Sequence, residues 1–300
     1  MTSARRCLLG PSLAAALLVP AVAHATTPTE RFSATQPGKI IAIGNALGLS
    51  HLASTNAPGT ADSIGTFISL GTGSDTSPAP GGWPMGTTND WTKNGSTAVL
   101  TIPQETQILY AELVWGGSWN YGGEVTTAST LDAPVTLQVD TVSNQITPDA
   151  ATALTIATTG HNTNGTTFAA NYYMRSADVT QLVQQHGGGT VSVSGVPATQ
   201  TETINSLNAA GWSLIIALRD PQEPIRNLAV YVGGTFVDEN TTVDYMINGL
   251  CVPPSGPLSG HVAISAIEGD ANLTGDQLLI GETQNGSFVN LSGPNNPEDN

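Results

Sequence analysis

Three acidic side chains near the C-terminal end form the clearest group for metal chemistry. Glu268, Asp270 and Asp276 flank the segment 271–275, which also contains one Asn and one Thr. Calcium in proteins is bound by several hard oxygens from carboxylates, amides and carbonyls, often on a loop that contains glycine. The spacing differs from that of an EF-hand. We therefore expect a candidate calcium site at these three residues, with ordinary solvated turns as the alternative.

A second acidic group, Asp238 and Asp244, has a looser spacing and is a second, weaker calcium candidate. The alternative is again that acidic and amide side chains occupy turns because of their backbone preferences. The whole chain has a net charge of −15, so divalent cations would also bind to it nonspecifically. Calcium is the one cofactor that the sequence suggests.

Acid–base chemistry would need carboxylates in a cleft, and Glu112 is the carboxylate to consider first. It interrupts the apolar run 108–115, and Glu124 follows shortly after. A glycoside hydrolase needs two carboxylates about 5–10 Å apart. A carboxylate inside an apolar strand must instead be neutralised or paired. We expect a structural pairing of Glu112, Asp220 or Glu223 with Arg219 or Arg226, and no catalytic residue.

Aromatic side chains offer a third kind of site, because exposed rings stack on the faces of sugars. Trp119 and Tyr121 follow a Gly-Gly break, and Trp83 and Trp91 lie in a segment rich in Pro and Gly. These four residues are the candidate ligand-binding residues, and packing of their rings in loops or in the core is the favoured interpretation. Alternation along the strand places Trp115 on the same face as neighbouring apolar residues, so we expect it in the core.

Nucleophilic catalysis has little support in the sequence. Cys251 is the one cysteine that follows residue 25, and His261 is the nearest histidine to it. A lone cysteine forms no internal disulfide and, without clustered ligands, no zinc site. The chain has no nucleophile elbow, no P-loop and no His-Glu-x-x-His motif.

The elements that would position these residues are predicted to be strands. Short runs rich in Val, Ile, Thr or Tyr recur between clusters of turn residues, as is typical of strands. Their number and spacing predict an all-β fold, a β-sandwich or jelly roll. The predicted strands are 66–70, 97–102, 107–115, 135–140, 167–174, 190–193, 211–218, 226–232, 241–247, 261–267 and 277–280.

One short helix is expected near residues 178–186. Asp178 can cap its start, and Val179, Leu182 and Val183 form one apolar stripe at helical spacing. The glycines at 187–189 end it. We expect this helix to cross one end of the sandwich.

The first 25 residues have the features of a cleavable secretory signal peptide. Arg5 and Arg6 precede the apolar stretch 8–22, and the small-x-small segment 23–25 gives a cleavage site. Cleavage would leave six Lys and Arg against 23 Asp and Glu. No later stretch has the roughly 20 apolar residues that span a bilayer. We expect a secreted, extracellular or envelope protein.

The composition along the chain indicates how it divides into parts, and its net charge excludes some classes of partner. We expect N-terminal strands and a Pro/Gly-rich loop in 26–96, a sandwich body in 97–292 that forms one domain with 26–96 in the alternative division, and a polar tail in 293–300. Nucleic acids and anionic membranes need clustered cations, which this acidic chain lacks. The expected partners are a surface polymer, a carbohydrate or another envelope protein.

Four segments in order resemble the N-terminal β-sandwich module of bacterial secreted and cell-surface proteins. In that family, immunoglobulin-like repeat domains of unknown function usually follow the module. The resemblance covers about two thirds of the chain, and it rests on 109–117, 175–180, 210–231 and the acidic pair of segments 268–270 and 274–276. It implies an extracellular or envelope location and an adhesive or structural role. No such repeats occur within these 300 residues.

The function expected from the sequence is that of an exported, non-enzymatic surface or matrix module, adhesive or structural and stabilised by calcium. A carbohydrate-binding β-sandwich is the first alternative, and it requires exposed Trp or Tyr rings. A secreted glycoside hydrolase is the second alternative, and it requires two carboxylates that face a cleft.

Overall fold

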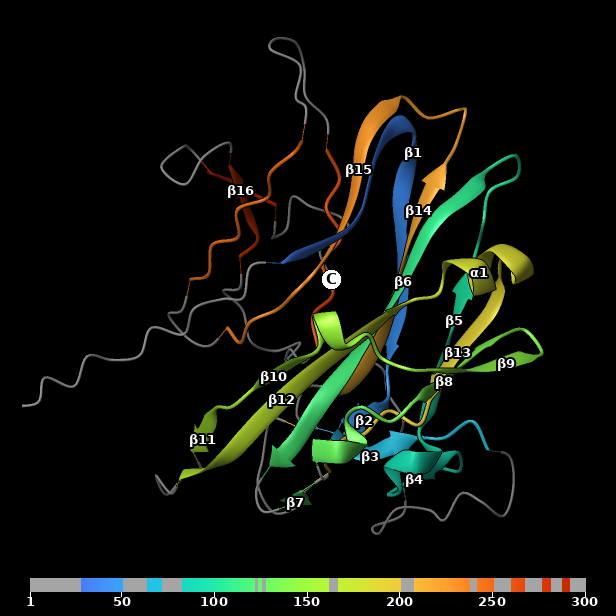
Figure 1. Cartoon of the computed structure of the whole chain (residues 1–300). Helices are drawn as coiled ribbons and strands as arrows, with labels where there is room; N and C mark the ends of the chain where they lie inside the picture. Colours follow the sequence, from blue (N-terminus) through green and yellow to red (C-terminus); the bar gives the residue numbers. More distant parts are fainter. Residues whose placement is uncertain are drawn as a thin grey trace, which may run out of the picture.

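Long antiparallel strands make up most of the computed structural model of the chain (Figure 1). The described part contains a single α-helix, so the predicted β-rich fold with one short helix is confirmed. The described residues are 28–50, 64–71, 83–121, 124–125, 128–161, 167–200, 208–237, 242–250, 260–267, 277–281 and 288–291.

The largest sheet is antiparallel and curled, and it contains the longest strands. Its order is β10 (Leu154–Ile156), β12 (Thr167–Asp178), β6 (Gln107–Tyr121), β14 (Ala210–Arg219), β1 (Thr29–Ala46) and β15 (Ile225–Val232). Two further short strands extend it: β11 (Thr159–His161), which pairs with β12, and β7 (Glu124–Val125), which pairs with β6.

The first strand explains why this sheet curls. Residues 29–37 of β1 pair with β15, whereas residues 38–46 pair with β14. The change of partner falls at Pro37 and Gly38, and Figure 1 shows β1 rising to this bend and returning beside β14. A side chain at Gly38 would collide with the carbonyl oxygen of Leu218, so glycine lets the two backbones approach closely.

A second sheet covers one face of the first, as expected for a sandwich. Its order is β5 (Gly95–Leu100), β13 (Gly189–Ser194), β8 (Val135–Val139) and β9 (Val142–Ile146). Alternate residues of facing strands point into the space between the sheets and form the main core. This core includes Leu113, Trp115, Leu214, Ile216, Leu137, Val191 and Val193.

A smaller core lies on the opposite face of the first sheet, under the arm formed by β15 and the first half of β1. Tyr110, Ala217 and Val230 are buried there, and Phe32 packs against them. The rings of Phe32 and Tyr110 stack with centroids 5.3 Å apart and planes 7° from parallel. The arm therefore covers the second apolar face of the first sheet, which the second sheet does not cover.

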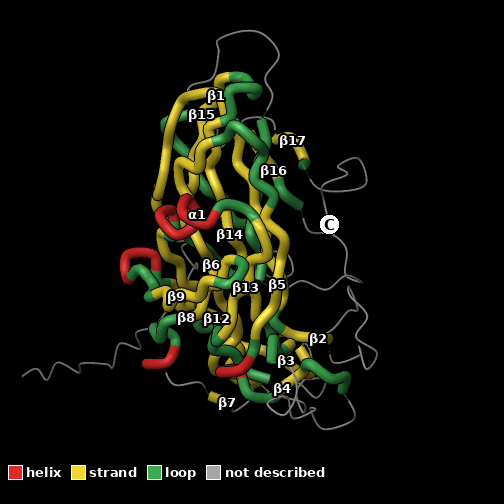
Figure 2. The backbone as a smooth tube through the Cα atoms, turned by 90° about the vertical axis from the view of Figure 1, so that its right-hand side faces the viewer, coloured by secondary structure: helices red, strands yellow, loops and turns green. Residues whose placement is uncertain are grey.

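The helix α1 (Thr180–His186) lies beside β6, outside the long strands (Figure 2). Asp178 accepts a hydrogen bond from the backbone N–H of Thr180, and Gly187 ends the helix with φ 72°. The predicted stop at Gly187 is thus confirmed, whereas Asp178 lies one residue before the N-cap residue Val179, which makes no side-chain capping bond. The remaining elements are β2 (Gly48–Ser50), β3 (Ile64–Ile68), β4 (Thr87–Thr88), β16 (Leu279–Gly281), β17 (Phe288–Asn290) and the 3-10 turns η1 (Trp91–Lys93), η2 (Ala128–Thr130) and η3 (Ala150–Thr152).

Most of the predicted strands are present, but two are wrong. Residues 242–247 and 261–267 lie in the described part and form no strand. Their local composition resembles that of strands, but a strand also needs a partner to accept and donate its backbone hydrogen bonds. The first of the two stretches also leaves Tyr245, Met246 and Ile247 exposed.

No helix in the described stretches of the chain combines the length and the apolar composition that a membrane-crossing helix needs.

Candidate functional site

Glu112 is completely buried in the middle of β6, on the face opposite the main core. The Tyr110 hydroxyl, two residues earlier on the same face, donates a hydrogen bond to Glu112 Oε2. Arg31 Nε on β1 donates to the same oxygen at 3.3 Å. The other oxygen, Oε1, has no hydrogen-bond partner in the described part of the chain. A buried carboxylate needs such partners because burial removes its hydration.

Arg31 links this buried acid to the outside of the sheet. Its Nη1 lies 2.8 Å from Oδ2 of Asp149, so one guanidinium pairs with two carboxylates. Burial opposes the charge on Arg31, but the Glu112 carboxylate and hydrogen bonds to Tyr110 and Asp149 outweigh it and raise its pKa. Burial, together with the hydrogen bond to Glu112, also raises the pKa of Tyr110 well above its ordinary value. Tyr110 therefore stays protonated as a donor.

Asp149 is fixed at the start of the turn η3. The backbone N–H of Ala151 donates to its Oδ1 at 2.9 Å, which is the usual way an Asp begins such a turn. That hydrogen bond and the Arg31 guanidinium hold the pKa of Asp149 below its ordinary value, against a smaller opposing effect of burial. Asp149 is consequently an ionised acceptor at neutral pH.

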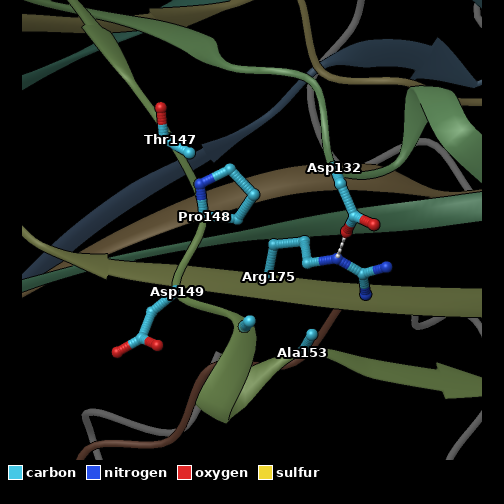
Figure 3. A pocket seen from close by; sticks show the side chains of 7 residues that line it. Asp132, Thr147, Pro148, Asp149, Ala153 and Arg175 are labelled. Atoms are coloured by element: carbon cyan, nitrogen blue, oxygen red, sulfur yellow. Dashed lines mark hydrogen bonds and ion pairs between the residues drawn. The ribbon is translucent and has the colours of Figure 1, made fainter.

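A pocket of about 270 Å³, with Asp149 in its lining, lies beside the turn η3 (Figure 3). It is open to solvent and combines two carboxylates, one guanidinium and several small apolar side chains. The lining residues are Asp132, Thr147, Pro148, Asp149, Ala150, Ala153 and Arg175.

Arg175 is the most buried of the polar residues in this pocket, with 5% of its side chain exposed. Its Nε donates to Asp132 Oδ1 at 2.7 Å, and its Nη1 donates to the carbonyl oxygens of Leu154 and Met174. The guanidinium carbon also lies 5.5 Å from the ring centre of Tyr173. These contacts fix the guanidinium in one orientation, so the pocket is preorganised.

A second hollow, of about 300 Å³, lies at the start of α1. It has one carboxylate, that of Asp178, which already accepts the hydrogen bond from Thr180. The arrangement offers fewer charged groups than the pocket around Arg175. That pocket is therefore the better candidate for a ligand site.

The predicted acid–arginine pairing is right at one position and wrong at another. Glu223 pairs with Arg226 at 2.6 Å, as expected for the corner between β14 and β15. Lys39 joins the same corner, with its Nζ 3.1 Å from Asp220 and 3.2 Å from Glu223. Glu112, however, pairs with Arg31 and not with an arginine of this corner, because β1 lies between β14 and β15.

The calcium candidates lie almost entirely outside the described residues. Glu268, Asp270, Asp276 and Asp238 are not described, and Asp244 is described and exposed. Within the described stretches, no group of three His, Cys, Asp or Glu residues is arranged to hold a metal ion. The calcium site therefore stays a prediction.

Three of the aromatic candidates, Trp83, Trp91 and Trp119, have side chains that the structure describes. Trp91 and Trp119 are half-buried and pack against the main core, and Trp83 is half-buried too. Trp119 and Tyr121 belong to β6, which continues through Gly116 and Gly117 instead of ending at Trp115. The side chain of Tyr121 lies outside the described part. Trp115 is fully buried, as predicted.

Comparison with protein-family models, curated proteins and solved structures found no match. The resemblance to the module of bacterial surface proteins therefore stays an expectation from the sequence.

The residues that sequence reasoning missed are Arg31, Asp132 and Asp149, and Arg175 appeared only as part of a resemblance. One signal was available: few cations follow residue 25, so a buried Glu112 had few partners from which to choose. Which of them it meets depends on the path of β1, which no local pattern indicates.

Proposed function

We propose that the chain is an exported, non-enzymatic module with an adhesive or structural role at the cell surface or in an extracellular matrix. The observation that supports this most is the environment of Glu112. Both of its donors bind the same oxygen and lie on β1 and β6, so the carboxylate joins the first strand to the middle of the sheet. The Glu112 carboxylate therefore holds parts of the fold together.

The hydrolase alternative receives no such support. Glu112 was its main candidate, and a side chain with 0% exposure cannot approach a glycosidic bond. A retaining or inverting mechanism needs two carboxylates that reach the substrate from opposite sides. Asp132 and Asp149 do reach a pocket, but each is already paired with an arginine. The Ala151 N–H and the Arg31 guanidinium lower the pKa of Asp149, which makes it a poor general acid.

The carbohydrate alternative, as far as it depends on exposed aromatic rings, also has less support. Trp91 and Trp119 place part of their surface against the main core, which leaves less ring area to stack on a sugar.

The proposal includes calcium as a stabiliser of the acidic segment 268–276. Metal binding there would stiffen a surface module without taking part in a reaction.

Co-sedimentation tests the proposal directly. The purified chain is mixed with washed, insoluble bacterial cell-wall polymer, and bound protein and newly formed reducing ends are both measured. We expect saturable binding with no release of reducing ends. Because the chain is acidic, the binding should not depend on attraction to an anionic polymer, and it should persist when salt screens surface charge.

Two outcomes would contradict the proposal. Reducing ends that form with the native chain would favour the hydrolase. A chain that stays in the supernatant at all salt concentrations would contradict the adhesive role.

A further inference from the structure

The pocket around Arg175 has a feature that a purely structural role does not need. Arg175 donates through Nε and Nη1 to protein acceptors, whereas its Nη2 makes no hydrogen bond to a described residue. Asp132 Oδ1 takes the Nε bond, which leaves Oδ2 beside the guanidinium. One donor and one acceptor therefore lie next to each other in a pocket that opens to solvent (Figure 3).

The charges of this pocket are already compensated. Asp132 pairs with Arg175 at 2.7 Å, and Asp149 pairs with Arg31 at 2.8 Å. An anion would meet the two carboxylates of the lining, and a cation would meet the Arg175 guanidinium. A neutral ligand avoids both repulsions and still satisfies the remaining donor and acceptor positions.

The lining matches the two kinds of surface that a sugar presents. A hydroxyl group both donates and accepts, so a pair of neighbouring hydroxyls can bond to a carboxylate oxygen and a guanidinium nitrogen at once. Pro148, Ala150 and Ala153 supply small apolar surface for the C–H groups of a sugar ring. The same wall contains few long flexible side chains, so little entropy is lost when a ligand binds.

We propose that this pocket binds a single neutral sugar unit through neighbouring hydroxyls, with Asp132 and Arg175 as the specificity-determining pair. A volume of about 270 Å³ suits one ring, since pockets for larger ligands begin at about 300 Å³. This ligand goes beyond the proposed surface role and does not depend on it. A ligand of this size with few contacts binds with a Kd on the order of 1 mM.

Titration of the full chain with methyl glycosides of glucose, galactose and mannose, followed by NMR, tests this assignment. At least one of the three sugars should shift the resonances of residues 147–153 and of the Arg175 Nε group. Sodium acetate and calcium chloride, at the same concentration and ionic strength, are the charged probes. They should leave those resonances in place.

The turn η3 provides a matched pair of variants. Ala150 and Ala151 are neighbours and are both exposed, but only Ala150 lines the pocket. Ala150→Leu should fill part of the pocket and raise the Kd at least about tenfold, whereas Ala151→Leu should leave it unchanged. Asp132→Asn, whose parent side chain is 65% exposed, should weaken binding while the fold is retained.

Three results would overturn the proposal. The first is that none of the three glycosides shifts the pocket resonances. The second is that Ala150→Leu and Ala151→Leu bind the sugar equally well. The third is that acetate or calcium moves these resonances while the neutral sugars do not, which would make the pocket an ion site.

Discussion

Arg31 on β1 donates to the buried carboxylate of Glu112 on β6 at 3.3 Å, although 81 positions separate the two residues in the chain. Arg31 also reaches Asp149 at 2.8 Å, so one cation connects the arm, the centre of the sheet and the edge of the polar pocket. Removing the cation from a buried pair leaves an uncompensated charge, which is costly. The position of the arm and the pairing of the buried Glu112 carboxyl therefore depend on each other.

The close approach of β6 to β12 gives a first prediction. A Cβ at Gly116 would overlap the carbonyl oxygen of Tyr173, which belongs to the backbone and cannot rotate away. We expect Gly116→Ala to lower the free energy of unfolding by about 1–3 kcal/mol, because the strands must separate to admit the methyl group. Urea unfolding measures this loss.

Gly211→Ala is the matched control for that variant. Gly211 lies on β14 in the same sheet, and the nearest atom to its added Cβ would be Asn45 O at 3.4 Å, an ordinary contact. Its stability should change little. Equal losses in the two variants would contradict the role assigned to Gly116.

The corner between β14 and β15 predicts a dependence on acid. The N–H of Gln222 and the Lys39 ammonium lower the pKa of Asp220, and Arg226 and Lys39 lower the pKa of Glu223. A carboxyl with a lowered pKa in the folded state stabilises the fold above its ordinary pKa of about 4. That contribution is lost as the pH falls through the lowered value. Acidification should therefore weaken the fold.

Comparison of two lysine variants isolates this effect. Lys39→Met should lower stability at neutral pH and should flatten the decline of the urea midpoint between about pH 5 and pH 3. Lys93 is exposed and has no ion pair with a described residue, so Lys93→Met should keep the native decline. A native pH profile in Lys39→Met would argue against the proposed linkage.

The sequence predicts the central strands of the fold well, for a physical reason. Runs such as 211–218 are apolar on both faces because the main core and the smaller core cover the two sides of the sheet. The short helix is also predictable, since Asp178 and Gly187 mark its ends locally.

The first strand could not be predicted in the same way. β1 contains Pro37 and Gly38 in its middle, and such a pair usually indicates a turn. In this fold the pair bends a continuous strand where it changes partner. The ion pairs of Arg31 follow from the same long-range event, because they form only when the first half of β1 packs over the face of β6 that carries Tyr110 and Glu112. Local spacing contains no information about that contact.

The acidic segment near the C-terminal end gives a prediction from sequence alone. Calcium that binds the folded state should raise its stability by about 2.7 kcal/mol at a hundredfold excess over Kd. We expect thermal unfolding with calcium to shift upward relative to chelator, and Asp270→Ala and Asp276→Ala to lose the shift. Asp244→Ala serves as the comparison for the second candidate group.

Magnesium at the same ionic strength is the control for nonspecific binding to an acidic chain. An identical shift with magnesium, or an unchanged melt with calcium, would reduce both acidic groups to ordinary turns.

The central claim is that Glu112 serves as a structural tie to Arg31, and a double-mutant cycle tests it most directly. Urea unfolding is measured for the native chain, Arg31→Met, Glu112→Gln and the double variant. We predict a loss of about 3 kcal/mol for Arg31→Met, which leaves the buried Glu112 carboxyl without its guanidinium partner, and a double variant that loses clearly less than the sum of the two single losses. Strictly additive losses, or a Glu112→Gln chain as stable as the native one, would contradict the claim.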